Sequence, residues 1–292
     1  MEKTHFKSSH PSWIKRTVNV SEKFKHTRSI LSGLNTVCSS AQCPNQNLCF
    51  NDGVATFLIL GNICTRNCRF CAVQKGTPAE IDKTEPARIA QATIKLKLSH
   101  IVITSVTRDD LEDGGAEQFV SCIKEIRRTQ KGVTVEVLTS DFKGSKSSLD
   151  KIIEAHPDVF GHNIETVPRM YPVLRPGADY GRSLDVIRYV SEKSNIITKS
   201  GMMLGVGEKQ KEVIDCMNAL FGCGCRVLTI GQYLSPSKEH FPVFEYIEPH
   251  IFEYLKCVAY GIGFSRVLSG PFVRSSYKAK MYYDGIKDMY IP

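Results

Sequence analysis

Six short apolar runs, separated by amphipathic stretches, constrain the fold of this chain more than any other feature. The runs are short enough for buried β-strands, and they span residues 54–60, 100–106, 133–138, 159–162, 196–199 and 226–230. The stretches between them have helical spacing, as at Leu149, Ile152 and Ile153. Strand followed by helix, repeated about six times, predicts a parallel sheet with its helices packed outside. We therefore expect an α/β fold, a partial (β/α)6 TIM-like barrel.

Polar and unusual residues fall mostly just after each predicted strand. These segments are residues 64–71, 107–110, 139–141, 163–165, 200–208 and 232–238. Enzymes with β/α barrels have their active sites at the carboxyl ends of the strands. The six segments are therefore expected to converge on one mouth of the barrel.

Three cysteines in the first of these segments, Cys64, Cys68 and Cys71, supply three thiolates within eight residues. Three protein ligands suit a cluster of four irons and leave one iron open to substrate or cofactor. Zinc is the main rival, but a structural zinc site needs a fourth ligand, and the next histidine along the chain is His100. The spacing favours an iron-sulfur site of catalytic type.

A second triad, Cys38, Cys43 and Cys49, lies just upstream and again lacks a close fourth ligand. The chain has 11 cysteines, and nothing in it indicates secretion, so metal binding is a better interpretation than disulfides. The remaining cysteines are interpreted as small buried hydrophobes.

Composition is that of a globular chain, with 42% hydrophobic and 23% charged residues in a length of 292. The apolar runs are too short to cross a bilayer, so we expect no membrane association and a cytoplasmic location. The formal charge of +8 is concentrated at the two ends. Basic ends could attract nucleic acid or an acidic protein partner, or simply be solvated surface.

The first triad, with Phe70 before its last cysteine, resembles the signature of the radical S-adenosylmethionine (SAM) superfamily. The upstream triad and a C-terminal Arg274-Ser275-Ser276-Tyr277 together look like the lipoyl synthase family. Similar blocks cover residues 55–61, 103–110, 163–166, 175–180 and 231–234, so that the resemblance extends over roughly residues 11–279. The chain departs from the family at Ser39-Ser40, where acids are usual, at Thr107, usually Asp, and at Phe50, usually Trp.

The resemblance implies two [4Fe-4S] clusters and S-adenosyl-L-methionine as cofactors. Cys64, Cys68 and Cys71 would hold the SAM-binding cluster, with Phe70, Ser105 and Asn163 as candidate contacts of SAM. An auxiliary cluster would be held by Cys38, Cys43, Cys49 and one serine of the C-terminal motif, for which family alignment favours Ser276. An oxygen ligand beside thiolates would mark the iron that is released when that cluster gives up sulfide.

The implied reaction is radical insertion of two sulfur atoms at C6 and C8 of a protein-bound octanoyl-lysine, which makes the lipoyl cofactor. Its carriers would be lipoyl domains of 2-oxoacid dehydrogenase E2 subunits and the glycine cleavage H protein, with ferredoxin or flavodoxin as electron donor. An acidic carrier could be steered by basic residues such as Lys7, Lys15, Arg16, Lys23 and Lys278. We expect an N-terminal extension at residues 1–52, the radical SAM barrel at 53–262 and a C-terminal tail at 263–292.

Three alternatives are weighed against this interpretation. The nearest is a radical sulfur-inserting enzyme that acts on a free small molecule, as biotin synthase does, but the upstream triad and the tail serine disfavour it. A zinc-stabilised nucleic-acid module is disfavoured by the six β/α units and the lack of aromatic-basic clusters. A two-cluster electron carrier would have four cysteines per cluster and a much shorter chain.

Overall fold

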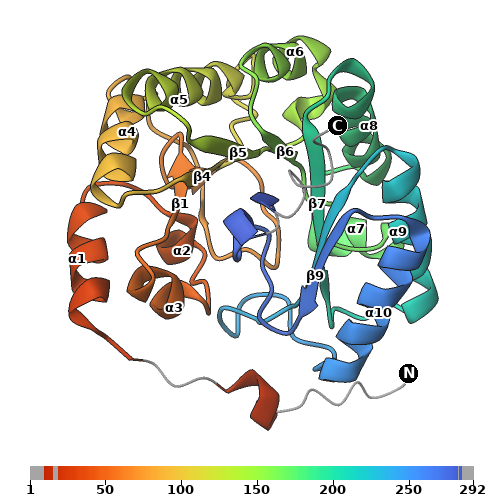
Figure 1. Cartoon of the computed structure of the whole chain (residues 1–292). Helices are drawn as coiled ribbons and strands as arrows, with labels where there is room; N and C mark the ends of the chain where they lie inside the picture. Colours follow the sequence, from red (N-terminus) through yellow and green to blue (C-terminus); the bar gives the residue numbers. More distant parts are fainter. Residues whose placement is uncertain (1–9, 16–18, 282, 285–292) are drawn as a thin grey trace.

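The main sheet has seven parallel strands in the part of the chain that the structure describes, and their order across the sheet follows their order in the sequence (Figure 1). The computed structural model describes residues 10–15, 19–281 and 283–284. The strands of the sheet are β1 (Thr56–Ile59), β4 (His100–Ser105), β5 (Thr134–Leu138), β6 (Val159–Gly161), β7 (Ile197–Leu204), β8 (Val227–Gln232) and β9 (Arg266–Gly270). The sheet curves into an open barrel with β1 and β9 at its edges, which is the predicted partial barrel.

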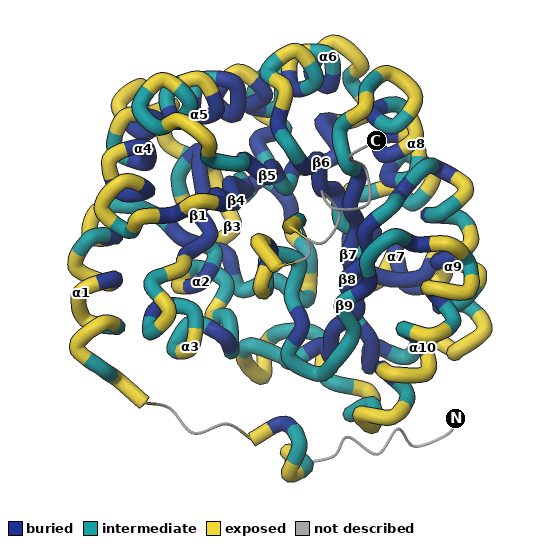
Figure 2. Tube along the Cα trace, in the orientation of Figure 1, coloured by how far each residue is buried: buried dark blue, intermediate teal, exposed yellow. Residues whose placement is uncertain are grey.

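Six helices surround the sheet: α4 (Glu85–Lys95), α5 (Ala116–Thr129), α6 (Lys146–Glu154), α8 (Tyr180–Lys193), α9 (Gln210–Gly222) and α10 (Pro249–Ile262). In α5, Phe119, Ile123 and Ile126 are almost fully buried, and their spacing of three and four places them on one face toward the sheet. Each such side chain contributes about 2 kcal/mol by burial. Figure 2 shows that the outward faces of these helices are exposed. Among the described residues, no helix is long and apolar enough to span a membrane.

All six predicted strands are present, but β7 continues beyond the predicted end at residue 199, as far as Leu204. Its polar and small residues, Ser200 and Gly201, gave the appearance of a loop. Both pair with β8 within the sheet. A side chain at Gly201 would lie 2.6 Å from Thr229 Oγ1, so the strand requires glycine there.

The seventh strand, β9, was missed by the sequence pattern. It is an edge strand, paired on one side with β8, and of its residues Val267 alone is buried. A half-exposed strand of this kind lacks the continuous apolar run by which the other strands were recognised.

The N-terminal segment covers the open edge of the sheet at β1. It contains a short 3-10 helix (Ser12–Ile14), α1 (Glu22–Ile30), α2 (Val37–Ser40) and α3 (Gln46–Asn51). Thr36 forms an antiparallel bridge with Phe57 of β1, and Asn35 O accepts a hydrogen bond from Leu58 N at 2.9 Å. The second cysteine triad therefore lies beside β1.

The C-terminal tail turns back from β9 into the barrel, where Figure 1 shows its helical turn inside the ring of strands. It packs closely on β8, because a Cβ at Gly231 would lie 2.1 Å from Val273 O. Further on, Ala279 packs with Val102 and Val227. Tyr283 hydroxyl then donates to Asp158 at 3.3 Å, just before β6 begins. The tail thus crosses the barrel interior from one end to the other.

Candidate functional site

A cavity of about 500 Å³ opens at the carboxyl ends of the strands. All three cysteines of the first triad line it, as do Cys43, Ser275 and Ser276. Residues of the segments after β1, β4, β5, β6 and β8 take part in the lining, as the sequence predicts. The segment after β7 differs, since β7 itself supplies Gly201, Met202 and Met203 there and Glu208 lines another cavity.

The loop that carries the first triad is held by a small parallel sheet of β2 (Ile63–Cys64) and β3 (Gln74–Lys75). Within the loop, Cys71 N donates to Cys68 O at 3.2 Å, and Arg66 N donates to Cys64 Sγ at 3.4 Å. These hydrogen bonds from backbone N–H groups hold the loop in its observed conformation.

Burial raises the pKa of three of the triad cysteines, Cys38, Cys68 and Cys71. The pKa of Cys71 is raised to about 12 and that of Cys38 to about 11. These thiols are therefore protonated near neutral pH. Metal ligation requires thiolates, so binding of iron would release protons and strengthen with rising pH.

The second triad is spread over α2, the following turn and α3. Cys43 N donates to Cys38 O at 3.0 Å, which closes the turn between the first two cysteines. Cys43 lines the cavity, whereas Cys38 is buried and Cys49 packs against the core. The triad therefore lies at the cavity wall on the side of β1.

Two serines of the C-terminal motif lie on different sides of the cavity. Thr56 Oγ1 donates to Ser276 Oγ at 2.8 Å, and the backbone of the same threonine hydrogen-bonds the Cys38 thiol. Asn163 Nδ2 instead donates to Ser275 Oγ at 2.6 Å. Ser276 is thus the serine beside the second triad.

The three residues predicted to contact SAM all line the cavity. Phe70 packs against a buried cluster that includes Leu174 and Tyr233. Ser105 is the last residue of β4, and Asn163 lies two residues after the end of β6. Ser105 Oγ and Asn163 Oδ1 are buried and have no hydrogen-bond partner among the described residues. A buried polar atom without a partner costs about 1–3 kcal/mol, which is the pattern of a site built for a polar ligand.

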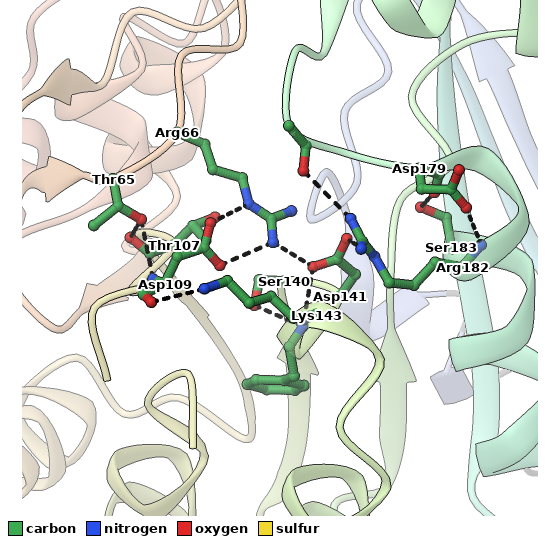
Figure 3. Close-up of polar contacts among 12 residues, drawn as sticks. Thr65, Arg66, Thr107, Asp109, Ser140, Asp141, Lys143, Asp179, Arg182 and Ser183 are labelled. Carbon is green, nitrogen blue, oxygen red and sulfur yellow. Dashed lines mark hydrogen bonds and ion pairs between the residues drawn. The ribbon is translucent and has the colours of Figure 1, made fainter. Parts of the chain in front are cut away.

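An ion-pair network lies beside the first triad (Figure 3). Arg66 is bidentate with Asp109, at 2.7 and 2.9 Å, and also bonds Asp141 at 2.6 Å. Burial alone would raise the pKa of Asp141, but the hydrogen bond and charge of Arg66 outweigh it and hold that pKa well below its usual range. Asp141 and Arg66 are therefore both charged at neutral pH.

Among the described residues, no three His, Cys, Asp or Glu side chains are grouped around one ion position. The cysteines of a four-iron cluster each bind a different iron, so such a triad does not converge on one point.

Comparison with known proteins identifies the family. The model of the radical SAM superfamily matches residues 58–220. A lipoyl synthase of Caldicellulosiruptor saccharolyticus is 50% identical over 273 residues, 92% of this chain and 96% of the relative. That of Porphyromonas gingivalis is 47% identical over 274 residues, 93% of this chain and 97% of the relative. The chain belongs to the lipoyl synthase family. It is a radical SAM enzyme that inserts sulfur, as its motifs predict.

Two solved structures share the fold of this chain. Methylornithine synthase is 14% identical with a TM-score of 0.56, covering 84% of this chain and 81% of that one. A maturase of the [FeFe]-hydrogenase is 14% identical with a TM-score of 0.57, covering 89% and 74%. Membership of the superfamily implies a SAM-binding [4Fe-4S] cluster and SAM as cofactors of this chain.

Two candidate functional residues, Glu165 and Arg175, were not singled out from the sequence. Both line the cavity, where burial raises the pKa of Glu165 and Asn163 Nδ2 donates to its Oε1 at 3.0 Å. Arg175 donates to Tyr171 hydroxyl at 2.8 Å and hydrogen-bonds the Cys68 thiol, while its Nε has no partner in the described part of the chain. Both lie in sequence blocks that resemble the family, but Arg175 is too far from a strand end to be placed by pattern.

Proposed function

We propose that this protein inserts two sulfur atoms, at C6 and C8, into an octanoyl chain attached to a lysine of a lipoyl carrier protein. One observation supports this most directly: the first triad, part of the second triad and the tail serines line one cavity. Sulfur insertion requires a radical source and a sulfur source within reach of the same carbon chain. A shared cavity meets that requirement.

In this proposal Cys64, Cys68 and Cys71 hold the SAM-binding cluster. When bound, that cluster supplies the electron that cleaves the sulfonium of SAM and yields a 5′-deoxyadenosyl radical. The chain's own task is to hold SAM and exclude water. The guanidinium of Arg175 and the carboxyl of Glu165 complement the carboxylate of methionine and the amino or hydroxyl groups of the ligand. Ser105 and Asn163 offer the buried atoms without partners.

The auxiliary cluster, which would supply the sulfur, is assigned to Cys38, Cys43, Cys49 and Ser276. Ser276 is favoured over Ser275 because Thr56 bonds both Ser276 and Cys38, which brings the serine to the second triad. Ser275 bonds Asn163 on the side of the first triad. The two serines therefore have separate surroundings, although they are adjacent in the sequence.

The octanoyl chain is expected to lie along the apolar part of the cavity wall. Val37, Val73, Val106, Met203 and Leu234 contribute to that wall. Because the substrate is tethered through a lysine of a folded carrier, the cavity mouth must remain open to an extended side chain.

The proposed partners are the lipoyl domains of 2-oxoacid dehydrogenase E2 subunits, the glycine cleavage H protein and an electron donor such as ferredoxin or flavodoxin. Lys15, Lys23 and Lys278 are exposed and available to an acidic carrier. Lys7 and Arg16, which were also considered for steering, lie outside the described residues. A cytoplasmic location is part of the proposal.

The assignment of Ser276 can be tested by replacing each serine with alanine. Anaerobic enzyme would be given SAM, a reductant and an octanoyl-lysine peptide, and the peptide mass and 5′-deoxyadenosine would be measured. Ser276→Ala is expected to abolish sulfur insertion, retain cleavage of SAM and release iron to a chelator faster. Ser275→Ala is expected to keep the parental rate of iron release. Sulfur insertion at the parental level by Ser276→Ala would refute the assignment.

A further inference from the structure

Arg66 lies between Cys64 and Cys68 in the loop of the first triad, yet its side chain is buried. The side chain is 6% exposed and carries three charge-assisted hydrogen bonds. Its acceptors, Asp109 and Asp141, belong to the segments after β4 and β5. One guanidinium thus joins the cysteine loop to two neighbouring strand ends (Figure 3).

The network continues beyond Arg66 to helix α8. Asp141 has a fully buried side chain, and its second oxygen accepts from Arg182 Nε at 2.8 Å. Arg182 also donates to Gly177 O at 3.3 Å, in the segment between α7 (Tyr171–Leu174) and α8. The other side of the cysteine loop is bound to the same region, because Arg69 N donates to Leu174 O at 2.9 Å. The cysteine loop is therefore hydrogen-bonded to the rest of the protein on both sides, through Arg66 and through Arg69.

We propose that Arg66 is a positioning residue, which fixes the geometry of the loop of Cys64, Cys68 and Cys71 and balances the charge beside it. The proposal rests on the assignment of that triad to the SAM-binding cluster. Buried ion pairs contribute little net stability, because the cost of desolvation offsets their attraction. What this network provides is a fixed loop, so that less conformational entropy is lost when the cluster binds.

Arg66 and Arg182 face Asp109 and Asp141, and the exposed Lys143 adds a positive charge at the edge of the network, where its Nζ donates to Asp109 O at 3.0 Å. Reduction adds one negative charge to a neighbouring cluster, so its potential responds to any imbalance. Loss of the Asp141 carboxylate leaves excess positive charge and should raise the reduction potential. Loss of the Arg66 guanidinium leaves excess negative charge and should lower it. Opposite shifts distinguish this role from general destabilisation.

The test uses full-length protein in which Cys38, Cys43 and Cys49 are replaced by alanine, so that any remaining cluster belongs to the first triad. Arg66→Gln, Asp141→Asn and Arg66→Lys would be made in that background. Midpoint potential would be measured by an electron paramagnetic resonance titration, and iron retention by exposure to a chelator. Arg169→Gln is the matched control, because Arg169 is also bidentate with a carboxylate, Glu212, but half-exposed and outside the cavity lining.

We expect a lower potential in Arg66→Gln and a higher one in Asp141→Asn, each with faster loss of iron. Arg66→Lys keeps the charge but not the planar fork, so its potential should stay near the parent while iron is still lost faster. Parental potential and iron retention in all three variants, as in Arg169→Gln, would overturn the proposal. Failure of the cluster assignment is separate, because Cys64→Ala would then retain its iron.

Discussion

Thr56 contacts both of the distant segments to which we assign the auxiliary cluster. Its backbone hydrogen-bonds Cys38 and its hydroxyl bonds Ser276, across 220 positions of sequence. This contact pattern adds a structural reason for the choice of Ser276 over Ser275, which family alignment also favours. Nothing in a local sequence pattern reports it, because the contact forms only when the tail has entered the barrel.

The cysteines could be recognised from sequence because their spacing is local and their chemistry is specific. Ser105 and Asn163 could be selected only through resemblance to a family, and the structure adds that both have buried atoms without partners. The position of Arg175 at Cys68 could not be predicted, since it depends on how the segment after β6 folds back over the cavity.

His162 should make stability depend on pH. Burial, followed by the charge of Arg175, lowers its pKa to about 4, and its Nδ1 donates to Thr139 O at 3.0 Å. The unfolded chain takes up this proton near pH 6.5, before the folded protein does, so stability should fall as pH drops from about 7 toward 4. The loss attributable to His162 is about 3 kcal/mol.

This dependence can be measured by urea unfolding under anaerobic conditions at pH 7.5 and pH 5. His162→Gln should lose less stability over that interval than the parent. The control is His26→Gln, at an exposed position of α1, which should behave as the parent does. Equal losses in His162→Gln and the parent would contradict the assignment of a neutral buried histidine.

At the scale of elements, the strands were predictable where both faces are buried. β9 was not, since it is an edge strand with one buried residue, and the end of β7 was not, since close contacts impose polar and small residues there. In both cases tertiary contact, rather than local preference, determines the element.

The close packing of the C-terminal tail against β8 should depend on Gly231. Alanine there would place its Cβ 2.1 Å from Val273 O and push the tail away from the strand. We expect the free energy of unfolding to fall by about 1–3 kcal/mol and iron of the auxiliary site to be lost faster. Both follow because the displaced tail carries Ser276.

Gly222→Ala is the matched control for this prediction. Gly222 is at the end of α9, and a Cβ there has no atom within 4 Å. Alanine should leave iron content unchanged and raise stability by up to about 1 kcal/mol. Chemical unfolding and iron analysis of both variants provide the comparison. Equal behaviour of the two variants would show that the tail is not seated as described.

At the scale of the whole molecule, an open barrel is completed by the two ends of its own chain. The N-terminal segment covers the edge at β1, and the C-terminal tail fills the interior. The sequence predicts the barrel from its repeating units, but not the path of the tail, because that path is set by contacts between residues far apart in the chain.

We propose that the two cysteine triads hold two different iron-sulfur clusters around one cavity. The most direct test is iron and zinc analysis of anaerobically prepared protein and its two triad variants, together with SAM cleavage. We predict about eight irons per chain and about half of that in either variant. The variant lacking Cys38, Cys43 and Cys49 should still cleave SAM, and the variant lacking Cys64, Cys68 and Cys71 should not. A zinc protein, or full iron content after loss of either triad, would contradict the account.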